Sequence, residues 1–138
     1  MPMTNCSITK SLTCTLALLA VAGTAWGQKP KTPPPPKITP AMLALGDSIF
    51  HGQVGGAACF GCHGAQGKGM PKLAPDLTSG KWIHGDGSYD AIMKTIEQGV
   101  PKPTEAAGPM PPMGGAKLTP DQLKAVAAWV YSLSHPAK

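Results

Sequence analysis

The feature that most constrains this chain of 138 residues is the sequence Cys-Phe-Gly-Cys-His at positions 59–63. Two thiols separated by two residues can each form a thioether with one vinyl group of a single porphyrin, and the adjacent histidine is then held close to the iron. A neutral imidazole is a good axial ligand for that iron. The motif therefore predicts one haem c, covalently bound through Cys59 and Cys62, with His63 as one axial ligand.

Two other uses of a Cys-x-x-Cys pair fit the surrounding sequence less well. A thioredoxin-like redox pair follows a β-strand in a βαβ setting, whereas residues 52–58 are glycine-rich and have no strand pattern. A structural zinc site needs four ligands, usually from a second Cys or His pair at short spacing. The sequence after His63 offers no such pair, so haem attachment is the favoured interpretation.

The first 27 residues have the pattern of a secretory signal peptide. Lys10 supplies a positive charge, residues 12–22 form an apolar run, and residues 25–27 have the small-x-small pattern of a cleavage site. We expect export to the periplasm, which agrees with haem c because bacteria attach it outside the cytoplasm. An uncleaved membrane anchor is the alternative. Residues 28–39 are rich in Pro and Lys and predict an extended linker, which leaves residues 40–138 as the folded domain.

Helix signals in residues 40–138 predict four short helices, and no alternating strand pattern is present. The haem motif itself is expected to form one helical turn. Three longer helices are predicted from their capping residues, which are Thr39, Ser88 and the capping box at residues 119–122. Glycines and prolines predict loops over residues 64–80 and 100–117. The fold class is therefore expected to be all-α.

The composition leaves little apolar material for a core, since 17 glycines and 16 prolines are present among 138 residues. Chains with so much Gly and Pro approach the composition of disordered sequences. A large, flat, apolar cofactor linked to the backbone can supply the missing core. We therefore expect the chain without haem to be poorly folded.

The order of these signals resembles the class I cytochromes c over nearly all of residues 40–134. Six patches carry the resemblance: Gly46 with Phe50, Cys59–Gly64, Ala74–Leu77, Ile96–Val100, Met110–Gly115 and Ala127–Val130. The resemblance implies the cytochrome c fold, with about four short helices packed around one covalently attached haem. It also implies that Gly46 lets the first and last helices approach, and that Phe50 packs against Trp129.

The resemblance implies two further residues beside the haem. In such proteins the carbonyl of the proline in the Pro-Asp-Leu patch, here Pro75, accepts the second imidazole N–H of His63, which fixes the tautomer of the ligand. The indole N–H of Trp82 could reach a haem propionate. Trp82 could equally fill a loop.

The second axial ligand is expected to be a methionine, and two methionines compete for the role. Aligning the family's Met-Pro pattern favours Met110, whereas counting back from Thr119 favours Met113, which we keep as the alternative. His84 is interpreted as a solvated loop residue and His51 as the end of the first helix rather than as iron ligands.

Methionine ligation leaves the iron no open position for oxygen or peroxide, so electron transfer is favoured over catalysis. We therefore expect a periplasmic electron carrier that is not itself an enzyme. A haem c subunit of a larger dehydrogenase or oxidase complex is an alternative. A haem-based ligand-binding or sensory domain is another.

The charge pattern bears on the partners. All 12 basic residues are lysines, against seven acidic residues, and several lysines lie in the segments expected around the haem. Such a rim suits redox proteins with acidic docking surfaces. The pattern is not typical of nucleic-acid binders. We expect a monomer that meets a membrane only through an uncleaved signal or a membrane-bound partner.

Overall fold

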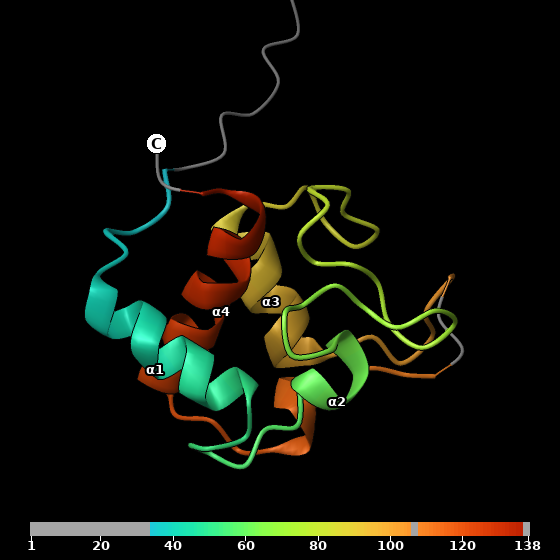
Figure 1. Cartoon of the computed structure of the whole chain (residues 1–138), viewed down its shortest axis with the longest axis horizontal. Helices are drawn as coiled ribbons and strands as arrows, with labels where there is room; N and C mark the ends of the chain where they lie inside the picture. The colour runs from blue at the N-terminus through green and yellow to red at the C-terminus, as the bar shows by residue number, and fades with distance from the viewer. Residues whose placement is uncertain (1–33, 106–107, 137–138) are drawn as a thin grey trace, which may run out of the picture. The chain divides into compact units, whose positions relative to one another are not determined.

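The computed structural model describes residues 34–105 and 108–136. The predicted signal peptide and the first part of the predicted linker lie outside the described residues. In chain order the elements are the helices α1 (Pro40–Phe50), α2 (Phe60–His63) and α3 (Tyr89–Gln98), the 3-10 turn η1 (Pro112–Gly115) and the helix α4 (Pro120–Ser134). The part of the chain that the structure describes contains two isolated β-bridges and no β-strand. The predicted all-α domain of four short helices is confirmed (Figure 1).

Each of the three longer helices begins at the residue that the sequence predicts. The hydroxyl of Thr39 accepts the Met42 N–H (3.2 Å), and the hydroxyl of Ser88 accepts the Ala91 N–H (3.2 Å). At α4 the capping box is complete, because the Thr119 hydroxyl accepts the N–H of Gln122, whose side chain accepts the Thr119 N–H. Such caps contribute about 1 kcal/mol each, so the helix starts are set by local sequence.

α1 crosses α4 at Gly46, where the two backbones nearly touch (Figure 1). A Cβ atom at Gly46 would collide with the carbonyl of Ala125 and lie 2.7 Å from Trp129 Cβ. One turn later the rings of Phe50 and Trp129 pack with their centroids 4.2 Å apart. The close approach and the aromatic contact expected between the first and last helices are therefore both present.

α3 packs against the other side of α4 and completes the core. Ile92 and Ile96 of α3 are buried, as are Val126 and Val130 of α4. The Tyr89 hydroxyl donates a 3.0 Å hydrogen bond to a carbonyl of α4. The three longer helices thus form a frame, and the long loops after α2 and α3 lie along one side of it (Figure 1).

The turn η1 lies inside a stretch that the sequence predicts as loop. It is not a regular helix, because Met113 and Gly114 have left-handed backbone angles, with φ of 53° and 65°. Gly114 O accepts the N–H of Ala58 at 3.3 Å. η1 therefore folds back onto the residue just before the Cys-x-x-Cys-His motif.

Candidate haem-binding site

A cavity of about 670 Å³ opens beside α2. Sites for small molecules and cofactors typically measure about 300–1,000 Å³. The walls are largely apolar and come from α2, the loop after it, α3, the segment before η1 and α4. Among the lining residues are Ile92, Ile96, Val126 and Val130. A cavity of this size and polarity fits a flat apolar macrocycle.

Both thiols of the motif line this cavity. α2 is a single turn, and it begins with the Cys62 and His63 N–H groups donating to Cys59 O at 3.2 and 3.0 Å. Burial raises the pKa of the Cys59 thiol, and the neighbouring Cys62 acts in the same direction. The one-turn helix thus brings both cysteines and His63 to one edge of the cavity.

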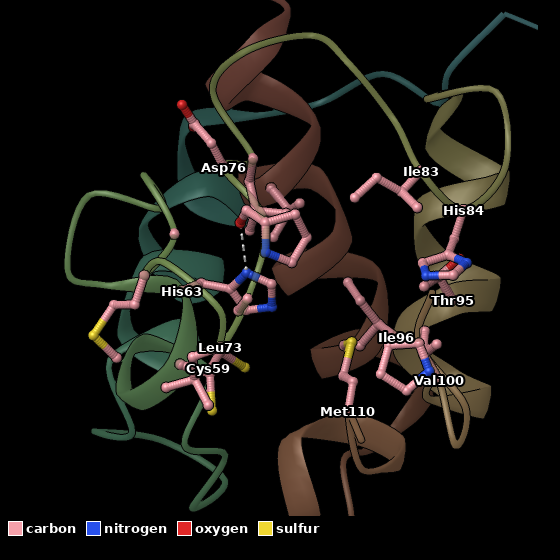
Figure 2. A pocket seen from close by; sticks show the side chains of 18 of the residues that line it. Cys59, His63, Leu73, Asp76, Ile83, His84, Thr95, Ile96, Val100 and Met110 are labelled. Carbon is pink, nitrogen blue, oxygen red and sulfur yellow. Dashed lines mark hydrogen bonds between the residues drawn. The ribbon is translucent and has the colours of Figure 1, made fainter. Parts of the chain in front are cut away.

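His63 is buried, with 8% of its surface exposed, and its ring projects into the cavity (Figure 2). Nδ1 lies 3.2 Å from Pro75 O. Because a carbonyl oxygen only accepts, Nδ1 carries the proton and donates it, which leaves the lone pair on Nε2. Burial lowers the pKa of His63, although the bond to Pro75 opposes this. The ring is therefore neutral and its Nε2 is unprotonated, as a metal ligand requires.

The loop after α2 places Pro75 opposite His63. The Gly69 N–H donates to His63 O and the Leu77 N–H donates to Gly67 O, both at 2.8 Å. Gly69 has φ +74°, and a Cβ there would lie 2.6 Å from both Ala74 O and the Pro75 carbonyl carbon. Only glycine permits this close approach, so the loop returns tightly enough to bring the Pro75 carbonyl within reach of the ring.

Met110 extends into the cavity from the side opposite α2 (Figure 2). Its backbone is paired with Val100, since the Val100 N–H donates to Met110 O (2.8 Å) and the Met110 N–H donates to Val100 O (3.0 Å). Gly99, with φ +67°, ends α3 directly beneath this pair, and a Cβ there would lie 2.5 Å from Met110 O. The end of α3 thus fixes where the Met110 side chain starts.

Met113 takes a different path. As far as the described residues show, the cavity wall includes Met110 and does not include Met113. The Met113 side chain is half-buried and, like that of Met110, packs against the hydrophobic core. Of the two candidate ligands, Met110 is the one that the structure brings to the same cavity as His63.

Trp82 lines the cavity as well, and its indole N–H is buried without a hydrogen-bond partner in the part of the chain that the structure describes. A buried donor without a partner costs about 1–3 kcal/mol, so an acceptor is expected in the cavity. Gly87 has φ +78°, and a Cβ there would overlap the indole ring. His84 is half-buried and lines the same cavity (Figure 2), rather than lying in solvent as the sequence suggests.

Sequence reasoning missed the pairing of Val100 with Met110 and the role of Gly99 beneath it. The glycine at the end of α3 beside the β-branched Val100 is a local signal that can indicate such a close backbone contact. The burial of Trp82 by Gly87 was also missed. It depends on a loop whose path has no local signal.

The comparison with known proteins agrees with this geometry. The family model described as cytochrome C oxidase, cbb3-type, subunit III matches residues 44–130. The chain belongs to this family of cytochrome c domains. Its cofactor is therefore covalently bound haem c, as predicted, and domains of this family are electron-transfer modules.

Two curated relatives illustrate the match. The cbb3-type cytochrome c oxidase subunit CcoP of Rubrivivax gelatinosus is 40% identical over 95 residues, which cover 69% of this chain and 27% of the relative. The subunit FixP of Bradyrhizobium diazoefficiens is 41% identical over 76 residues, covering 54% of this chain and 23% of the relative. The chain thus spans about a quarter of the length of these relatives, which are subunits of an oxidase complex.

Solved structures confirm the cytochrome c fold. Cytochrome cL of Methylophaga aminisulfidivorans has a TM-score of 0.50 at 25% identity, with 66% of this chain and 52% of that chain covered. A reducing HAO-like protein complex of Kuenenia stuttgartiensis has a TM-score of 0.53 at 22% identity, covering 73% and 47%. The second likeness concerns the fold alone.

Proposed function

We propose that this cytochrome c domain transfers single electrons through a haem that Cys59 and Cys62 would hold covalently and that His63 and Met110 would ligate. Bound haem c supplies one-electron chemistry between Fe(III) and Fe(II). The observation that carries the proposal is the placement of His63 and Met110 on facing sides of one cavity beside the two thiols (Figure 2).

Three groups that line the cavity have different proposed roles. The Pro75 carbonyl keeps the proton of His63 on Nδ1, so Nε2 can bind metal without first losing a proton. As a soft ligand, the Met110 thioether would favour Fe(II) and raise the reduction potential relative to a second imidazole. The buried indole N–H of Trp82 would donate to a haem propionate, which satisfies an otherwise costly group.

The rim of the cavity supports a docking role. Lys68, Lys72 and Lys81 are exposed and line the cavity, together with the exposed apolar side chains of Leu73 and Ile83. A positive rim attracts acidic partners over a Debye length of about 10 Å, and an apolar patch favours transient contact. We propose that redox partners with acidic surfaces dock here.

We propose that this domain transfers electrons as part of a membrane-bound oxidase complex like those named for its relatives, and not as a free carrier. The sequence analysis favours a free carrier, whereas the matches to CcoP and FixP support the complex. None of the helices in residues 34–105 and 108–136 has the length and apolarity needed to cross a bilayer.

The native cell decides between these two routes. Solubilising the membranes in mild detergent and purifying the oxidase should recover this chain as haem-stained protein in a constant ratio to the oxidase. Recovery in the periplasmic fraction alone, with the purified oxidase free of it, would instead support a free carrier.

We also propose that residues 1–27 direct export. Mass spectrometry of the protein from either fraction should then find Gln28 at the mature N-terminus.

A further inference from the structure

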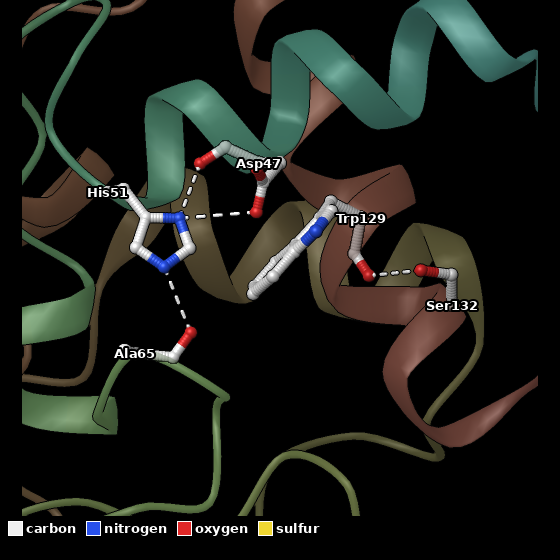
Figure 3. Close-up of polar contacts among 5 residues, drawn as sticks. All are labelled: Asp47, His51, Ala65, Trp129 and Ser132. Carbon is white, nitrogen blue, oxygen red and sulfur yellow. Dashed lines mark hydrogen bonds and ion pairs between the residues drawn. The ribbon is translucent and has the colours of Figure 1, made fainter.

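His51 joins the end of α1 to the segment that follows α2, and the site described above gives it no role. Its Nδ1 lies 2.9 Å from Asp47 O and 3.2 Å from Asp47 Oδ1, while its Nε2 lies 2.9 Å from Ala65 O. Figure 3 shows the ring between these groups. Ala65 comes two residues after His63 in the chain, so the contact reaches the segment that carries the proposed ligand.

The contacts of the ring require two protons. Carbonyl and carboxylate oxygens accept hydrogen bonds and cannot donate them, and a neutral imidazole has only one N–H. A neutral His51 could therefore bond to Asp47 or to Ala65, but not to both. Only the imidazolium makes both bonds at once, because in a neutral ring that donates to Ala65 the unprotonated Nδ1 faces the Asp47 oxygens.

The surroundings favour that cation. The bond to the Asp47 carbonyl raises the pKa of His51, and the Ala65 carbonyl and the Asp47 carboxylate act in the same direction, while partial burial opposes them. From the other elements the ring meets Phe60 of α2 and Trp129 of α4, which are uncharged. Among the residues that the structure describes, Asp47 is therefore the one charged residue in its hydrogen bonds and ring contacts. The carboxyl end of α1 also favours a positive charge.

We propose that His51 is a positioning residue for residues 64–69 and that it holds them to α1 more firmly when doubly protonated than when neutral. These residues contain the groups that orient His63, since the Gly69 N–H donates to His63 O and Gly67 O accepts the Leu77 N–H just beyond Pro75. After loss of one ring proton the ring can donate to Asp47 or to Ala65 but not to both, so the bond to Ala65 is made only part of the time. The effect on haem ligation rests on the function proposed above, whereas the effect on the loop does not.

The direction with pH follows from the raised pKa. The link is fully made below the unfolded-state value of about 6.5, and its contribution is lost as the pH rises through the higher folded-state value. Nuclear magnetic resonance titration of the ring in the holoprotein should therefore give His51 a pKa above about 6.5. Hydrogen exchange should show the amides of Gly67, Gly69 and Leu77 opening more often across the same range. After correction for intrinsic exchange, the rise should be about tenfold for each pH unit by which the pKa of His51 is higher with the segment closed than with it open.

Three variants sharpen the test. His51→Gln should remove the pH dependence of these amides. Asp47→Asn keeps both carbonyl acceptors and removes only the charge, so the transition should remain but move to lower pH. His135→Gln is the matched control, because His135 Nδ1 also contacts a carbonyl four residues back, Tyr131 O at 3.0 Å, but its hydrogen bonds stay at the end of its own helix. It should leave the loop amides unchanged.

A pKa of His51 at or below about 6.5 in the wild-type holoprotein would overturn the proposal. So would an exchange profile for the loop amides that is the same in His51→Gln as in the wild type. If His51→Gln does not fold, the wild-type titration and the displacement of the profile in Asp47→Asn decide the question. A wrong haem-ligand assignment would leave these amide profiles as predicted and would appear only in the visible spectrum.

Discussion

Gly99→Ala should displace the backbone of Met110, and Gly80→Ala provides a matched control. Both glycines have a left-handed backbone, with φ of +67° and +70°. A Cβ at Gly80 would meet nothing within 4 Å, whereas at Gly99 it would lie 2.5 Å from Met110 O, 2.7 Å from Pro112 N and 2.9 Å from the Pro111 carbonyl carbon. Both substitutions therefore place a Cβ on a backbone of positive φ, and Gly99→Ala alone adds the collision.

The two substitutions differ in how much they should lower the free energy of unfolding. An alanine in the left-handed region costs roughly 1–2 kcal/mol, which is the whole effect expected at Gly80. At Gly99 the colliding atoms are backbone and cannot rotate aside, so an overpacking cost of about 1–3 kcal/mol is added. We expect Gly99→Ala to lower the free energy of unfolding by about 2–5 kcal/mol in total.

Denaturant unfolding of the two ferric holoproteins, followed by far-ultraviolet circular dichroism, measures this difference. The absorption band of methionine-ligated ferric haem should weaken in Gly99→Ala and persist in Gly80→Ala, because only the first change moves the Met110 backbone. Free energies of unfolding that agree within about 0.5 kcal/mol, together with an intact band in both variants, would refute the reasoning that Gly99 positions the ligand.

Three further outcomes follow from the same structure. Cys59→Ala or Cys62→Ala in an export-competent host should leave little haem-stained, folded protein, since the chain needs its cofactor as core; yields equal to wild type would show that it does not. Burial raises the pKa of Tyr89, and the charge of Asp90 adds to this. The neutral Tyr89 therefore contributes its full stability below a pH of about 10, and this contribution should be lost as the pH rises through the higher folded-state pKa. Tyr89→Phe should lose about 0.5–1.5 kcal/mol near neutral pH with its hydrogen bond and flatten that alkaline fall, and an unchanged slope would contradict the assignment. Lys81→Glu at the cavity rim should slow electron transfer with an acidic partner at low salt, whereas Lys94→Glu, on α3 away from the cavity, should have a smaller effect; equal slowing would point to net charge alone.

The parts of the fold that sequence could predict are those with local causes. Thr39, Ser88 and Thr119 cap helices through atoms three residues away, so the helix starts needed no knowledge of the tertiary structure. Gly46 could be placed at the helix crossing because the resemblance to cytochromes c supplied its partner. The two thiols and His63 could be identified because their spacing alone defines the attachment chemistry.

The remaining features depend on contacts between segments that are distant in sequence. Spacing could not decide which of Met110 and Met113 lines the cavity, because that depends on the backbone pairing of Met110 with Val100 and on the left-handed turn at Met113. The half-buried position of His84 in the cavity wall depends on how its loop returns to α3. The bond from His51 to Ala65 has no signal in either segment alone.

The absorption band of methionine-ligated ferric haem in Met110→Leu and Met113→Leu tests the central claim most directly. Exchanging Met for Leu nearly conserves volume and usually costs under about 1.5 kcal/mol, so both variants should fold. The account predicts that the band disappears in Met110→Leu and persists in Met113→Leu. Loss of the band in Met113→Leu with retention in Met110→Leu would contradict the proposal that Met110 is the second iron ligand.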